Sequence, residues 1–125
     1  MHLELGNIEE AYAHAQHALT LAEKNNETYY YALTLPLMGR ILARSGRAPI
    51  AEAEETALRG INLLDSLNVQ QQVAIALLCL ADIYVCRHSI ERATGSLKKA
   101  ETIFKDARAE YWLAKTRGFL SLLGS

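Results

Sequence analysis

Three segments of the chain share one pattern of small residues, and this repeat constrains the fold more than any other feature. The segments begin at Ile8, Ile50 and Ile90, at offsets of 42 and then 40 residues. Within each, small or apolar residues follow at spacings of 3, 4, 3 and 3, which places them on one helix face. The members are Ile8, Ala11, Ala15, Ala18 and Leu21; Ile50, Ala53, Ala57, Gly60 and Leu63; and Ile90, Ala93, Leu97, Ala100 and Ile103. Because most are Ala or Gly, another helix can approach this face closely.

A second kind of helix lies between these segments. The pairs Tyr31-Ala32, Val73-Ala74 and Leu113-Ala114 recur at the same offsets. Two amphipathic helices in a period of about forty residues indicate a helical solenoid. We therefore expect an all-α fold without a sheet, in which short loops make neighbouring helices antiparallel. The expected helices span 7–24, 28–44, 50–66, 70–87, 89–105 and 109–123.

Turn and cap residues separate these helices. Asn25-Asn26, Ser45-Gly46 and Asn68 have the chemistry of helix ends and turns. Pro49 falls in a first helical turn, and Ser89 is expected to cap its helix. Pro36 predicts either a kink in the helix at 28–44 or a helix start near residue 36, and we favour the kink because the repeat alignment runs through it.

The start of the chain also resembles a helix boundary. Leu5-Gly6-Asn7 looks like the last turn of one helix followed by the start of the next. The small face of the helix at 7–24 then has at most residues 1–5 as a local partner. We expect either a truncated array or a homodimer that covers this face in trans, with Ile8, Ala11, Ala15 and Leu21 as the self-association residues.

The charge distribution leaves two interpretations open. The net charge of −1 gives no general attraction to nucleic acid or to acidic membranes. Residues 1–65 nevertheless hold five Lys/Arg against nine Asp/Glu, whereas residues 87–118 hold eight against four. This asymmetry fits solvated faces of opposite bias, or a C-terminal half suited to an acidic partner or to head-to-tail association.

The cysteines and the apolar runs predict a cytoplasmic protein. Cys79 and Cys86 lie seven residues apart on one side of a helix, too far apart for a disulfide, and are expected to be buried thiols. No apolar stretch reaches the ~18 residues that span a bilayer, and the N-terminus lacks a secretory pattern.

The residues of both helix types resemble tetratricopeptide (TPR) repeats. Leu77, Leu80, Ala81 and Tyr84 match the first helix of that pattern, as do Leu35, Met38, Gly39 and Leu42; Ala11, Ala53 and Ala93 match the second. The repeat is longer than the TPR's 34 residues, no proline closes any copy, and Arg117 replaces an expected leucine. Such long repeats resemble those of bacterial multidomain regulators.

The resemblance implies one TPR-like domain over residues 1–125. It divides into an incomplete first repeat (1–26), a second repeat (27–67), a third repeat (68–108) and a C-terminal capping helix (109–125). This is an antiparallel helix-pair solenoid of about three repeats.

The resemblance also implies a non-catalytic module that binds a peptide or protein segment on a concave face. The matching residues are Leu33, Pro36, Arg40, Arg44, Ile75, Leu78, Asp82, Val85, Lys115 and Leu122. Inter-helix packing explains much of this surface equally well, because an error of one residue in the register rotates a helix face by about 100°. The alternative is a sensor or transducer segment of a bacterial transcription or signalling regulator. We expect no cofactor, no membrane and no direct nucleic-acid partner.

Other motifs give weaker signals. No Gly-rich phosphate loop, nucleophile elbow or HExxH motif is present, so we expect no enzyme. Glu10, His14 and His17 share a helix face, and solvated side chains explain them better than a metal site does. In Tyr29-Tyr30-Tyr31 we expect Tyr31 in the core; Tyr29 or Tyr30 is a candidate surface anchor, but exposed single aromatic residues are common and explain them better.

Overall fold

The computed structural model describes residues 5–124, and every regular element in that range is helical. The helices are α1 (Leu5–Lys24), α2 (Thr28–Ser45), α3 (Ile50–Ser66), α4 (Gln70–Cys86), α5 (Ile90–Asp106) and α6 (Glu110–Leu122). The predicted all-α class is confirmed, and the predicted bounds agree with these to within two residues. The boundary predicted at Leu5-Gly6-Asn7 is wrong, because α1 continues through these residues; residues 1–4 lie outside the described range.

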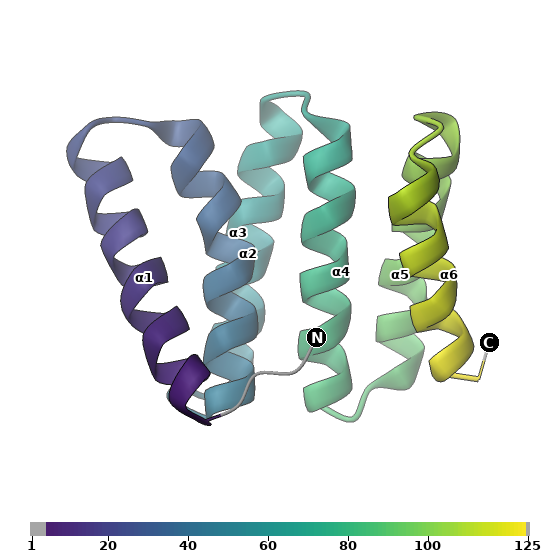
Figure 1. The fold of residues 1–125 in the computed structure, drawn as a ribbon, viewed down its shortest axis with the longest axis horizontal. Helices are drawn as coiled ribbons and strands as arrows, with labels where there is room; N and C mark the ends of the chain where they lie inside the picture. The colour runs from purple at the N-terminus through teal and green to yellow at the C-terminus, as the bar shows by residue number, and fades with distance from the viewer. Residues whose placement is uncertain (1–4, 125) are drawn as a thin grey trace.

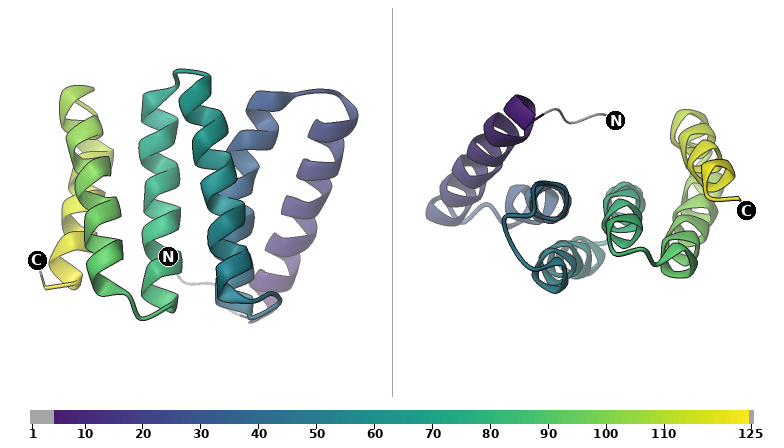
Figure 2. Two further views of the ribbon diagram at one scale, coloured as in Figure 1. Left: turned by 180° about the vertical axis from the view of Figure 1, so that it is seen from behind. Right: turned by 90° about the horizontal axis from the view of Figure 1, so that it is seen from below.

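Consecutive helices lie side by side and alternate in direction (Figure 1). The most extensive contacts join α2 to α3 and α4 to α5, and further contacts join α1 to α2, α3 to α4, α2 to α4, and α5 to α6. Seen from below, α3 and α5 lie on one side of the row, while α2, α4 and α6 lie on the other (Figure 2). α2 and α4 therefore run parallel and expose a shared face.

The core follows the repeat found in the sequence. Its largest fully buried apolar side chains include Leu64, Ile83, Leu97 and Phe104. The main apolar cluster draws residues from α2 to α6, and Phe104 stacks on Trp112 with ring centroids 5.9 Å apart. A smaller cluster joins Ala15 of α1 to α2. Burial of this apolar surface is the main force that holds the helices together.

Two glycines allow α2 and α3 to touch. A Cβ at Gly60 would lie 2.6 Å from Cδ of Pro36 and 2.9 Å from the carbonyl oxygen of Ala32. A Cβ at Gly39 would lie 2.7 Å from the carbonyl oxygen of Ala53. Any side chain at either position would push the two backbones apart, so the small-residue face functions as the sequence predicts.

Pro36 lies inside α2, which remains a single helix through it. Proline has no N–H, so the carbonyl of Ala32 loses its usual helical donor four residues on. That carbonyl faces Gly60, whose missing side chain lets the α3 backbone approach. The kink predicted at Pro36 therefore does not divide the helix.

Left-handed residues end the helices. Asn26, Gly46, Asn68, His88 and Arg108 have φ between 56° and 69°. In four of these turns, the residue that follows the left-handed residue donates its N–H back to a carbonyl of the preceding helix. One example is the bond from the N–H of Ala109 to the carbonyl of Phe104, 2.9 Å. Ser89 precedes α5 as expected, but its side chain makes no cap hydrogen bond, and Pro49 lies one residue before α3.

The first helix is also fixed by charge. Arg47, in the turn between α2 and α3, pairs with Glu9 and lies 4.0 Å from the centre of the Tyr12 ring.

Across the described residues, no helix has the length and apolar character that a membrane crossing requires.

Candidate functional site

An apolar hollow of about 250 Å³ lies between the N-terminal halves of α2 and α4. Leu33 and Leu37 line its α2 wall, and Ile75 lines its α4 wall. The remaining lining residues are Pro36, Leu64, Gln72, Ala76 and Cys79. Leu37 is 43% exposed although it is a large apolar residue, so it is the most accessible contact point in the hollow.

Charged residues continue this face beyond the hollow. Arg44 and Asp82 form a two-point ion pair between α2 and α4, with Nε–Oδ2 at 2.7 Å and Nη2–Oδ1 at 2.5 Å. Its hydrogen bonds to Asp82 raise the pKa of Arg44, against the opposing effect of burial. Arg40 is half-buried between the hollow and this pair. The face thus changes from apolar to charged along the two helices.

Both cysteines lie on this face. Burial raises the pKa of the Cys79 thiol, and the charges of Arg40 and Asp82 act on it in opposite directions. Burial is the larger cause that raises the pKa of Cys86, and the charge of Asp82 raises it further. Because the thiolate is the reactive form, both are weak nucleophiles at neutral pH. The lining of the hollow therefore offers apolar packing and the side-chain amide of Gln72.

The structure brings only part of the predicted site together. Leu33, Pro36 and Ile75 line the hollow, although less than 2% of Pro36 is exposed, so it forms the floor. Arg44 and Asp82 form an ion pair with each other, so the guanidinium that we expected to contact a binding partner is already paired within the chain.

Four other predicted residues lie outside the hollow. Leu78 and Val85 are half-buried and pack against the cluster of Ala81, Ala93, Leu97 and Leu120; Leu78 also packs against the main cluster. Lys115 and Leu122 project from α6, and neither lines the hollow; Lys115 Nζ lies 5.5 Å from the Tyr111 ring centre. A role of these four residues in partner binding stays a prediction.

Sequence reasoning missed Leu37 and Gln72. Leu37 follows Leu33 by four residues, so helical spacing places both on one face, and the same rule joins Gln72 to Ile75 and Cys79. Applying that spacing from Leu33 would have selected Leu37 together with Pro36. The pairing of Arg44 with Asp82 has no such local signal, because 38 residues separate them.

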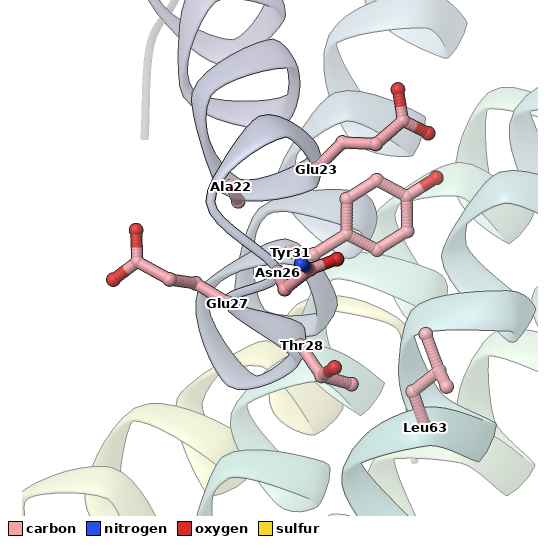
Figure 3. Close-up of a pocket in the computed structure, with 7 residues that line it drawn as sticks. All are labelled: Ala22, Glu23, Asn26, Glu27, Thr28, Tyr31 and Leu63. Atoms are coloured by element: carbon pink, nitrogen blue, oxygen red, sulfur yellow. The ribbon is translucent and has the colours of Figure 1, made fainter.

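A second hollow of about 290 Å³ lies where α1 meets α2, beside α3 (Figure 3). Tyr31 and Leu63 line it, and Arg59 Nη2 donates to the Tyr31 hydroxyl at 3.1 Å. Figure 3 shows the carboxylates of Glu23 and Glu27 on opposite sides and pointing apart, so they do not converge on a ligand. Tyr31 is thus half-buried at this rim rather than fully in the core.

The other sequence candidates are dispersed. Tyr30 is 58% exposed and contacts Tyr29 edge to face, so Tyr30 keeps the position expected of a surface anchor. Glu10 and His14 approach to 3.8 Å in solvent. Within the residues that the structure describes, no three His, Cys, Asp or Glu side chains are grouped to hold a metal ion.

The predicted self-association face of α1 is partly covered. Ile8 and Ala15 are buried, Ala11 is half-buried, and Leu21 is 46% exposed. Met38 and Ile41 of α2 pack with Ala15. The rest of the face, toward Ala18 and Leu21, lies open.

Comparison with known proteins gives no relative from which to argue. No family model matches the chain, and no curated protein and no solved structure matches it. The case for a function therefore depends on the geometry of the face shared by α2 and α4.

Proposed function

We propose that this chain is a TPR-like helix-pair solenoid that binds a segment of another protein in the hollow between α2 and α4. The observation that carries the proposal is the apolar wall of half-buried Leu33 and exposed Leu37, which faces Ile75 across two parallel helices. Exposed apolar clusters with a polar border are typical of protein interaction sites.

The size of the hollow favours a side chain over a metabolite. Small-molecule pockets are commonly about 300–1,000 Å³ and enclose most of the ligand. This hollow holds about 250 Å³ and is lined almost wholly by apolar atoms. One Leu, Ile or Phe anchor of a peptide suits it, and burying such a side chain contributes about 1.5–3 kcal/mol.

The charges beside the hollow orient the ligand. Arg40 lies one turn beyond Leu37 on α2, while Arg44 is paired with Asp82 further along. Arg40 already interacts within the chain, and the five N–H donors of a guanidinium allow a further charge-assisted bond to an acidic residue of a bound segment. The preferred ligand is an amphipathic segment with an apolar anchor followed by Asp or Glu.

A displayed library of random peptides tests this function. The immobilised chain should enrich sequences with an apolar anchor and a nearby carboxylate. Leu37→Glu should weaken the affinity of the enriched peptides at least tenfold, because it places a charge at the mouth of the hollow. Leu67→Glu is the matched control, since Leu67 is 42% exposed at the end of α3 and does not line the hollow.

Two results would remove the proposal. One is a library that yields no reproducible binder from chain that is folded by circular dichroism. The other is a set of binders whose affinity is the same for the Leu37→Glu and Leu67→Glu variants. Isothermal titration with one synthetic peptide should also give a negative heat-capacity change, as apolar burial requires.

A further inference from the structure

The helices at the two ends of the row expose faces that the inner helices bury. α1 aligns with α3 and α5, at the offsets of 42 and 40 residues. α6 aligns with α2 and α4 at the same offsets. In the row, α3 is covered by α2 and α5 by α4 through these faces.

No helix among residues 5–124 covers the outer face of α1. Gly60 of α3 and Ala100 of α5 are buried, yet Ala18 at the equivalent position of α1 is exposed. Ser96 of α5 is buried and donates to the carbonyl of Leu77 at 2.9 Å, yet its equivalent in α1, His14, lies in solvent.

Likewise, no helix in the described part of the chain covers the outer face of α6. Ala32, Leu35, Pro36 and Gly39 of α2 are buried against α3 or the core. The corresponding positions of α6 are all exposed: Ala114, Arg117, Gly118 and Ser121. A Cβ at Gly118 would meet nothing within 4 Å.

We propose that copies of this chain join end to end, with α6 of one copy packed on α1 of the next as α2 packs on α3. In that register Gly118 meets Ala18, as Pro36 meets Gly60, so one glycine still allows close approach. Ser121 meets Ala11, as Gly39 meets Ala53. Each contact completes one helix pair, and because the two surfaces differ, a further copy can add at either free end.

Charge supports this pairing. α1 carries Glu9, Glu10 and Glu23 against Lys24. α6 carries Lys115 and Arg117 against Glu110, although Arg117 also pairs with Glu101 and Glu9 of α1 with Arg47 within the chain. Opposite charges on the two ends favour head-to-tail contact and disfavour the symmetric contacts α1 with α1 and α6 with α6.

Sedimentation velocity of single-end variants tests the proposal. Ala18→Arg blocks the α1 end, and Gly118→Gln blocks the α6 end; both sites are exposed in the single chain, so the fold is retained. The controls are Ala13→Arg, whose equivalents Glu55 and Gly95 are also exposed, and Gly95→Gln, where a Cβ again meets nothing within 4 Å. Circular dichroism checks each variant.

The expected results are specific to a head-to-tail contact. The average mass of the unmodified chain and of both controls rises above 13.9 kDa with concentration. Ala18→Arg and Gly118→Gln each stay at 13.9 kDa alone, and an equimolar mixture gives a complex of two chains and nothing larger. An unmodified chain that stays at 13.9 kDa throughout, or a mixture that does not associate, overturns the proposal. So does loss of association in the controls, which would mean that the contact lies elsewhere.

Discussion

The pair α2 and α3 differs from the end helices α1 and α6 in what the same residue pattern achieves. In the pair, Gly39 and Gly60 lie so close to the opposite backbone that a methyl group would not fit. At the ends, Ser121 of α6 and Ala18 of α1 occupy the positions equivalent to Gly39 and Gly60, and both remain exposed. A stripe of small residues therefore marks where a helix can be approached, and burial follows only where a second helix is present.

The second inner pair shows how much variation the contact tolerates. α4 and α5 place Ala81 and Ala100 where α2 and α3 have Gly39 and Gly60, and both alanines are fully buried. Ser96 adds a buried hydrogen bond to the Leu77 carbonyl. The first pair depends on absent side chains, whereas the second uses methyl groups and one polar contact, so the two pairs should respond differently to added volume.

The largest expected effect is that of Gly60→Ala. The added methyl would lie under 3 Å from Pro36, Leu35 and Ala32, so the helices must separate. Overpacking of this kind costs about 3 kcal/mol, the upper part of its usual range. Urea unfolding measures the loss, and a change below that of a typical surface substitution would contradict the close contact.

The next effect compares two ion pairs. Arg44→Ala leaves Asp82, which is mostly buried, without its two-point partner, and should lower the free energy of unfolding by about 2 kcal/mol. Arg117→Ala removes an ion pair with Glu101 in which Arg117 is largely exposed. It should lower the free energy of unfolding by about 0.5 kcal/mol or less. Equal losses would remove the distinction between the inner helices and α6. Thermal melts of both variants at matched ionic strength provide the measurement.

A smaller effect of opposite sign is expected at the exposed glycines. Gly118→Ala and Gly95→Ala place a methyl in open space within a helix, where alanine is favoured over glycine by about 0.8 kcal/mol. Both should raise the unfolding midpoint in dilute solution. Destabilisation by Gly118→Ala in dilute solution would mean that this face of α6 is already covered.

The smallest expected effect on stability at neutral pH comes from three titratable side chains of α4. Burial raises the pKa of Cys79, Cys86 and Tyr84, so the folded chain holds these protons more tightly than the unfolded chain. Their contribution is fully present below the ordinary thiol value of 9.0 and is lost as the pH rises through the folded-state pKa values. The free energy of unfolding should therefore fall above pH 9, and less steeply in Cys79→Ala. An equal slope in that variant would contradict the assigned cause.

Sequence reasoning recovered the helices because their signals are local. The small-residue stripes and the turn residues Asn26, Gly46 and Asn68 define the helix ends, and the structure agrees. The left-handed turn at Arg108 gave no such signal, since arginine does not favour that conformation, and the one at His88 was missed although histidine is enriched there.

The candidate site was predicted less well because it depends on helix rotation and on distant contacts. The sequence indicated Leu33 and Ile75, which line the hollow, together with Leu78 and Val85, which do not line it and pack toward α5 and α6. It also could not show that Arg44 and Asp82 bind each other across 38 residues. Periodicity identifies the faces of a helix, whereas packing decides which face stays open.

Amide hydrogen exchange at two protein concentrations tests the difference between middle and ends most directly. In dilute solution, amides of α1 and α6 should exchange faster than those of α2, α3 and α4, because each end helix lacks one of its packing partners. At high concentration, protection should rise in α1 and α6 and stay constant in the inner helices, since end-to-end contact covers only the outer faces. Protection in α1 and α6 that does not change with concentration, or that rises equally in all helices, would contradict the account.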